Sequence, residues 1–83
     1  MGGINMLKIN SIAKNQTEII TDSMTIFFSY REPVACHIDG QGFFKTSKSW
    51  SKTTTAHVNK WLKNNRAENV TEKGQSFFDK LIA

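Results

Sequence analysis

Cysteine, histidine and serine are the side chains in this sequence that could carry out nucleophilic chemistry. Cys36 is the only cysteine, and His37 and His57 are the only histidines. Cys36 and His37 are adjacent, so on a strand their side chains point to opposite faces and cannot form a nucleophile–base pair. His57 could reach Cys36 or join a triad with Ser51 and Asp39, but no strained nucleophile elbow surrounds Ser51. We therefore expect no enzymatic activity and assign no catalytic residue.

A metal site or a bound cofactor is not expected either. One cysteine and two histidines cannot supply the usual ligand set of a structural zinc ion without the help of Asp39. Cys36 also shares the alternation of Val34 and Ile38, which is typical of a small buried hydrophobic residue. The chemistry of this chain is therefore expected to be binding.

Electrostatic binding has the strongest support, because the basic residues are unevenly placed. The chain has 83 residues and a net charge of +4. Residues 45–66 contain six basic residues and no acidic one, whereas the segments on either side each carry a small negative excess. Trp50 lies in the same segment and could stack on a base or a sugar. The candidate binding residues are Lys45, Lys48, Trp50, Lys52, His57, Lys60, Lys63 and Arg66.

This basic segment has two interpretations, and both remain open. A lysine-rich surface can bind the nucleic-acid backbone through its phosphates. Only two of the eleven basic residues are arginine, so bidentate reading of base edges is not favoured. In the other interpretation, the lysines simply solvate the outer face of an amphipathic helix or steer a protein partner.

The polar residues between Ser51 and Asn59 also have two interpretations. Hydroxyl groups and free backbone N–H groups at the start of a helix can hold an anion, to which His57 could donate. In the structural alternative, Ser51 or Thr53 caps the helix, and His57 or Asn59 bonds to a neighbouring strand or loop. Because Thr53 and His57 are one helical turn apart, a contact between them would need no ligand.

The first half of the chain has the alternation of strands. We predict strands at 7–12, 17–21, 24–30, 34–38 and 43–46. In the third of these, the alternation places four side chains on one face, namely Met24, Ile26, Phe28 and Tyr30. Pro33 interrupts the ladder because it has no N–H group to donate. The sequence Asp39-Gly40-Gln41-Gly42 tolerates positive φ and predicts a tight hairpin.

The second half has the periodicity of helices. A helix is predicted to run from Ser51 or Thr53 to about Asn64, where two asparagines can end it in left-handed geometry. One side of this helix carries Val58, Trp61 and Leu62, the opposite side carries Lys52, Lys60 and Lys63, and His57 lies on the flank.

Residues 68–71 are either a short strand or a loop. A second, short helix should follow Gly74, with Ser76 as its cap. Its apolar face is predicted to consist of Phe77, Phe78, Leu81 and Ile82.

These elements predict an α+β fold, a small antiparallel β-meander packed by one principal helix and a short C-terminal helix. The whole chain, residues 1–83, should form a single domain, with residues 1–6 as a flexible N-terminus. A domain of this size has a thin core, so a homodimer is one expected state.

Large apolar residues on both faces of the sheet raise the question of what covers them. If the two helices cover one face only, then Phe27, one of Phe43 and Phe44, and Trp50 form an exposed patch for self-association or for a host protein. If the C-terminal helix covers the second face, this patch does not exist.

One stretch of the sequence resembles a known family. The signature Ser51-x-Thr53-Thr54-x-x-His57-Val58-Asn59-x-Trp61-Leu62, preceded by Ser29-Tyr30 and Pro33-Val34-Ala35, is similar to small uncharacterised proteins of tailed phages and prophages. The resemblance covers roughly residues 24–64 and, more loosely, the C-terminal helix, and it implies a genomic context more than a mechanism. Such proteins are often host-takeover or counter-defence factors, which work by binding.

We therefore expect a non-enzymatic, phage-type accessory protein that binds nucleic acid through residues 45–66. The alternative is a counter-defence inhibitor, similar to anti-CRISPR proteins, that binds a host defence protein. No apolar run is long enough for a membrane span or a secretory signal. The expected location is the cytoplasm, which for a phage protein is the cytosol of the host.

Overall fold

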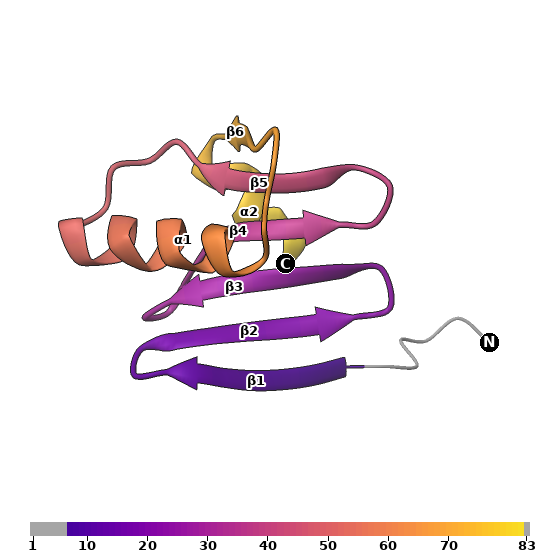
Figure 1. The fold of residues 1–83 in the computed structure, drawn as a ribbon, viewed down its shortest axis with the longest axis horizontal. Helices are drawn as coiled ribbons and strands as arrows, with labels where there is room; N and C mark the ends of the chain where they lie inside the picture. The colour runs from indigo at the N-terminus through magenta and orange to yellow at the C-terminus, as the bar shows by residue number, and fades with distance from the viewer. Residues whose placement is uncertain (1–6, 83) are drawn as a thin grey trace.

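The computed structural model describes residues 7–82 as one six-stranded sheet and two helices (Figure 1). The predicted flexible N-terminus, residues 1–6, lies outside the described residues. The strands are β1 (Leu7–Ala13), β2 (Gln16–Thr21), β3 (Met24–Ser29), β4 (Glu32–Ile38), β5 (Gly42–Thr46) and β6 (Thr71–Lys73). The helices are α1 (Lys52–Asn64) and α2 (Gln75–Leu81). The predicted α+β fold is confirmed.

The strands follow one another across the sheet in the order β1-β2-β3-β4-β5-β6. The first five form the predicted antiparallel meander. β6 departs from it, because this strand pairs in parallel with β5, from Phe44 opposite Thr71 to Thr46 opposite Lys73. A parallel neighbour needs a crossover connection, and α1 lies in that connection.

Short turns join the strands of the meander, and left-handed residues occur in all of them except the turn between β2 and β3. Asn15, with a φ of 61°, turns the chain between β1 and β2, and Gly40 and Gly42, with φ of 81° and 99°, turn it between β4 and β5. The predicted tight hairpin is therefore present. Tyr30 was expected to share a face with Met24, but this prediction is wrong, because Tyr30 has a φ of 59° in the turn after β3.

A β-bulge between β3 and β4 explains the position of Pro33. Phe27 pairs with Ala35 and Phe28 pairs with Pro33, so Val34 is the extra residue. Val34 and Ala35 consequently belong to the same core cluster, although simple alternation predicts opposite faces. A bulge is also one of the few positions where a strand tolerates a proline.

Each face of the sheet has its own hydrophobic core, and a helix covers each core (Figure 1). Under α1, Phe27 stacks on Trp61 with ring centroids 5.3 Å apart, and Val58 and Leu62 complete the contact. Under α2, Phe78 packs with Ile26, Cys36 and Phe44.

The expected aromatic patch for self-association is therefore absent. Phe27 and Phe44 are buried, Phe43 is half-buried against the α1 core, and the C-terminal helix covers the second face, as the alternative interpretation held. Ile82, predicted to join the apolar face of this helix, is exposed instead.

Most of the exposed large apolar residues lie at another place, on the edge strand β1. All seven residues of β1 are exposed, and Leu7, Ile9 and Ile12 are among them. Ile9 is 68% exposed. The first strand pairs with β2, and neither helix is found to pack on it. Within the described part of the chain, no helix is long and apolar enough to cross a membrane.

The caps of the helices agree with the sequence only in part. The Ser51 side chain accepts a hydrogen bond from the Thr54 N–H group at 3.1 Å, so one of the two predicted caps is confirmed. The second helix begins two residues earlier than a Ser76 cap predicts, since Gly74 takes the cap position and Ser76 lies inside the helix.

The buried thiol of Cys36 gives a testable prediction of pH dependence. Burial raises the pKa of Cys36 from its ordinary 9.0 to about 11. The thiol ionises more easily in the unfolded chain, so its contribution to stability is complete below pH 9 and is lost as the pH rises towards 11. The expected loss approaches about 3 kcal/mol. Urea unfolding across this pH range should show this loss, and Cys36→Ala should remove it.

Candidate functional site

The basic segment lies along one edge of the sheet and over the first helix. Lys45 is on β5, and Lys48 and Trp50 lie in the connection that leads from β5 into α1. Three further lysines are exposed on α1, and Arg66 follows its end. At about 100° per residue, Lys52 and Lys63 are only about 20° apart around the helix, on the side that also carries Asn59. One side of α1 therefore continues the basic surface.

Trp50 is half-buried, and its ring is held in place from several sides. Its indole N–H group donates to Gln75 Oε1 at 3.2 Å, and the same oxygen accepts from Thr46 Oγ1 at 2.8 Å. Gln75 in turn donates from Nε2 to the Pro33 carbonyl at 2.7 Å. Trp50 also packs against the α1 core. The indole therefore has one hydrogen bond, to Gln75 on α2, and Gln75 is itself held by hydrogen bonds to β5 and β4.

Two adjoining surface hollows share this tryptophan, and we call them together the Trp50 groove. The first has a volume of about 180 Å³ and extends towards β5, where Lys45, Lys48 and Glu72 line it. The second has a volume of about 410 Å³ and extends along the start of α1, where Lys52 and Ala56 line it. The residues common to both hollows are Ser49, Trp50, Thr55 and Asn59.

Positive charge dominates the rim of the Trp50 groove. The ammonium group of Lys48 lies over the Trp50 ring, 4.0 Å from its centroid. Lys45 Nζ lies 3.8 Å from Glu72 Oε2, which is the acidic group that lines the groove. Since Glu72 is largely exposed and Lys45 is partly exposed, this pair neutralises Lys45 only weakly in water. The groove thus combines a fixed aromatic ring with three lysines.

His57 belongs to a different environment from the other candidate residues. It is about 120–140° around the helix from Lys52 and Lys63. Its Nδ1 atom shares a hydrogen bond with Ser29 Oγ at 2.8 Å, and Ser29 Oγ lies 3.1 Å from Thr54 Oγ1. The structural interpretation, in which His57 bonds to a neighbouring strand, is therefore confirmed. His57 joins α1 to β3 and lies apart from the Trp50 groove.

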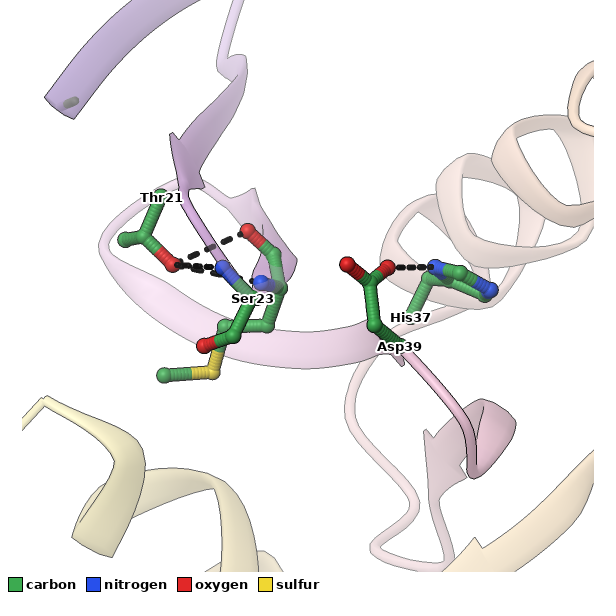
Figure 2. A network of polar contacts seen from close by, with 5 residues as sticks. Thr21, Ser23, His37 and Asp39 are labelled. Atoms are coloured by element: carbon green, nitrogen blue, oxygen red, sulfur yellow. Dashed lines mark hydrogen bonds and ion pairs between the residues drawn. The ribbon is translucent and has the colours of Figure 1, made fainter.

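The catalytic combinations considered from the sequence are not assembled. Cys36 lies in the core under α2, whereas His57 is on α1, across the sheet. Asp39 follows β4 at one end of the sheet and Ser51 precedes α1 at the other end (Figure 1). Figure 2 shows where Asp39 is instead: its Oδ1 lies 3.8 Å from His37 Nδ1.

The surroundings of the His37–Asp39 pair are those of a structural contact. The backbone N–H group of Asp39 donates to the Ser23 carbonyl at 2.9 Å, which ties this end of β4 to the turn before β3. In that turn, Thr21 Oγ1 accepts from the N–H groups of Ser23 and Met24 (Figure 2). Among residues 7–82, no group of three or more possible metal ligands is found.

Arg66 has a structural position that sequence reasoning did not find. Asn64 or Asn65 was expected to end α1 in left-handed geometry, but the left-handed residue is Arg66, with a φ of 53°. The N–H group of Ala67 bonds to the Leu62 carbonyl and that of Arg66 bonds to the Lys63 carbonyl, which is the Schellman arrangement. In this geometry a glycine normally takes the place of Arg66.

The variant Arg66→Gly is therefore expected to be more stable than the parent. Relief of the left-handed conformation should raise the free energy of unfolding by about 0.5–1 kcal/mol. Urea denaturation followed by circular dichroism measures this change. Arg66→Ala keeps the strain while removing the same charge, so a gain of equal size in both variants would contradict the explanation.

With the geometry established, a comparison with protein-family models finds one match. It covers residues 7–80 and is described as a family of unknown function (DUF8033). The chain belongs to this family. The matched region of the DUF8033 chain takes in all six strands and nearly all of α2, well beyond the residues 24–64 of the sequence resemblance. Searches of curated proteins and of solved structures give no match.

Two residues of this DUF8033 chain are important to the site region and were not found from the sequence. Gln75 holds Trp50 in place across 25 positions of the chain, and Ser29 bonds to His57 across 28. Neither has a local signal, because a glutamine or serine with a distant partner looks like any surface polar residue. The burial of Ser29 beside aromatic strand residues is visible only in the folded structure.

Proposed function

We propose that this chain is a small phage-type accessory protein that binds the phosphate backbone of nucleic acid and catalyses no reaction. The observation that carries the proposal is the placement of the basic segment. Six cations within residues 45–66 are folded so that three line the Trp50 groove, and Lys60 and Lys63 continue the positive surface along α1.

The chemistry of this surface favours phosphate over base edges. Lysine ammonium groups are compact point charges that attract phosphate without the bidentate geometry needed to read a base. Binding should therefore depend little on sequence and strongly on salt, since each phosphate contact releases a counterion. An accessory role in a phage or prophage, suggested by the sequence signature, suits a small protein that acts by binding.

A salt titration of binding tests the proposal. Fluorescence anisotropy with a labelled oligonucleotide of mixed sequence should show affinity that falls steeply as salt increases. With three to five lysine–phosphate contacts, the plot of log K against log salt concentration should have a slope between about −2 and −4. Affinity that does not change with salt, or no binding at low salt, would contradict the proposal.

A second candidate function is inhibition of a host defence protein by direct binding. The observation that favours it is the edge strand β1, which carries exposed Leu7 and Ile9 and has no strand on its outer side among residues 7–82. Strand addition to such an edge is a common mode of peptide recognition. Phe27 and Phe44 of the aromatic patch expected to carry this function are buried, and Phe43 and Trp50 are half-buried, so β1 replaces the patch in the proposal.

Introduction of a charge on β1 separates this candidate from the first. Ile9→Lys should abolish capture of a protein partner and leave nucleic-acid binding unchanged. Light scattering of the purified chain tests the expected homodimer, since pairing of two β1 strands would double the molar mass without any partner. Loss of nucleic-acid binding in Ile9→Lys would contradict the division of roles between the two surfaces.

A further inference from the structure

The Trp50 groove has features that specify its ligand beyond a negatively charged backbone. Trp50 is partly exposed, yet its indole is fixed by the hydrogen bond to Gln75, which is itself held by Thr46 and Pro33. A ring that is already oriented loses little conformational entropy on binding, so it is suited to act as a stacking platform.

The hollow along α1 places polar and cationic groups beside this ring. Its lining includes Asn59, whose side-chain amide can both donate and accept hydrogen bonds, and Lys52, whose ammonium group can contact a phosphate. Lys48, which lies over the Trp50 ring, lines the other hollow and is absent from the lining of this one. The aromatic platform, the amide and the lysine together match a ligand that has a flat base and a phosphate.

We infer that the Trp50 groove binds single-stranded nucleic acid, with one unpaired base stacked on Trp50 in the hollow lined by Ala56 and Asn59. This inference rests on the proposed function and names the form of nucleic acid that it requires. In a duplex, each base is stacked between its neighbours and cannot offer its face to a side chain set between a loop and a helix. An unpaired base can, and aromatic stacking is tolerant of sequence.

Tryptophan fluorescence gives a direct readout of this contact. The chain has two tryptophans, and Trp61 is only 4% exposed and stacked on Phe27. Quenching by oligothymidylate or oligouridylate of about 15 nucleotides should therefore report on Trp50, and comparison of the two strands shows whether DNA or RNA is preferred. A duplex of equal length should bind more weakly and quench less.

Three variants test the role of the ring. Trp50→Ala should weaken single-strand binding by about 5- to 150-fold, whereas Trp50→Phe should keep most of the affinity. Ala56→Leu leaves Trp50 untouched and places a good helix former at an exposed position of α1. Because the leucine side chain fills the hollow, this variant should also lose the preference for single strands. Tyr30→Gly is the matched control, because Tyr30 is an exposed aromatic residue outside the groove and glycine suits its positive φ.

The outcomes separate this inference from the proposed function. Equal, salt-dependent binding of single strand and duplex, unchanged in Trp50→Ala and Ala56→Leu, would overturn the stacking inference and leave backbone binding intact. Binding of dextran sulfate as tightly as oligothymidylate would overturn it as well. The absence of any binding at low salt, with variants that fold normally by circular dichroism, would overturn both.

Discussion

Replacement of Lys52 and Lys63 together by glutamate is expected to weaken binding of a single-stranded oligonucleotide by about 100- to 1,000-fold at low salt. An ion pair at about 4 Å in water contributes about 1 kcal/mol, so each reversal removes that attraction and adds a repulsion of similar size. Two reversals then approach about 4 kcal/mol, and salt screening reduces this value. Fluorescence anisotropy at several salt concentrations measures the change.

The fold should tolerate this double change, because its two effects on the helix oppose each other. Lys52 is the first residue of α1, where an acidic side chain is favoured by the helix dipole, and Lys63 lies in the last turn, where it is disfavoured. The control is Lys8→Glu with Lys14→Glu, which makes the same change in net charge on the hairpin of β1 and β2. A similar loss of affinity in the control would mean that overall charge, and no particular surface, drives binding.

Truncation of Phe27 to alanine is expected to lower the free energy of unfolding by about 3–5 kcal/mol. Phe27 is fully buried and stacked on Trp61, and it joins the centre of the sheet to α1. A domain of this length has a total stability on the order of 4–12 kcal/mol, so this single change removes a large part of it. Urea unfolding monitored by tryptophan fluorescence and circular dichroism measures the loss.

Two comparisons make this prediction specific. Ile9→Ala removes a large apolar side chain that is 68% exposed, and its cost should stay below about 0.5 kcal/mol. Phe78→Ala empties the core under α2, and it should cost about as much as Phe27→Ala. If Phe78→Ala released α2 without lowering the stability of the sheet, the two cores would be independent, contrary to expectation.

The first five strands and the two helices were predictable from the sequence, because each has a clear local pattern, whereas residues 68–71 were left open as a strand or a loop and the sixth strand is Thr71–Lys73. The alternation from Met24 to Phe28 and the helical spacing of Val58, Trp61 and Leu62 survive in the structure. The errors occur where a long-range effect outweighs the local one. Val34 turns to the side of Ala35 because a bulge adds a residue, and Arg66 takes a left-handed conformation next to two asparagines that prefer it.

The candidate site was predictable in its charge and less so in its geometry. The excess of lysine in residues 45–66 and the presence of Trp50 are visible in the sequence. The separation of His57 from the Trp50 groove follows from helical spacing together with the position of β3. The support from Gln75 depends on α2 returning to the edge of the sheet, which no local pattern encodes.

The edge strand β1 and the central strands β3 and β4 differ in how easily they would open. Within residues 7–82, β1 pairs with β2 alone and all seven of its residues are exposed, so it can detach at the cost of a single ladder. The amide protons of β3 and β4 lie between two cores and exchange with solvent only when the whole domain unfolds. Amide exchange should therefore spread inward from β1, and the native state includes brief openings in which β2 becomes the edge strand.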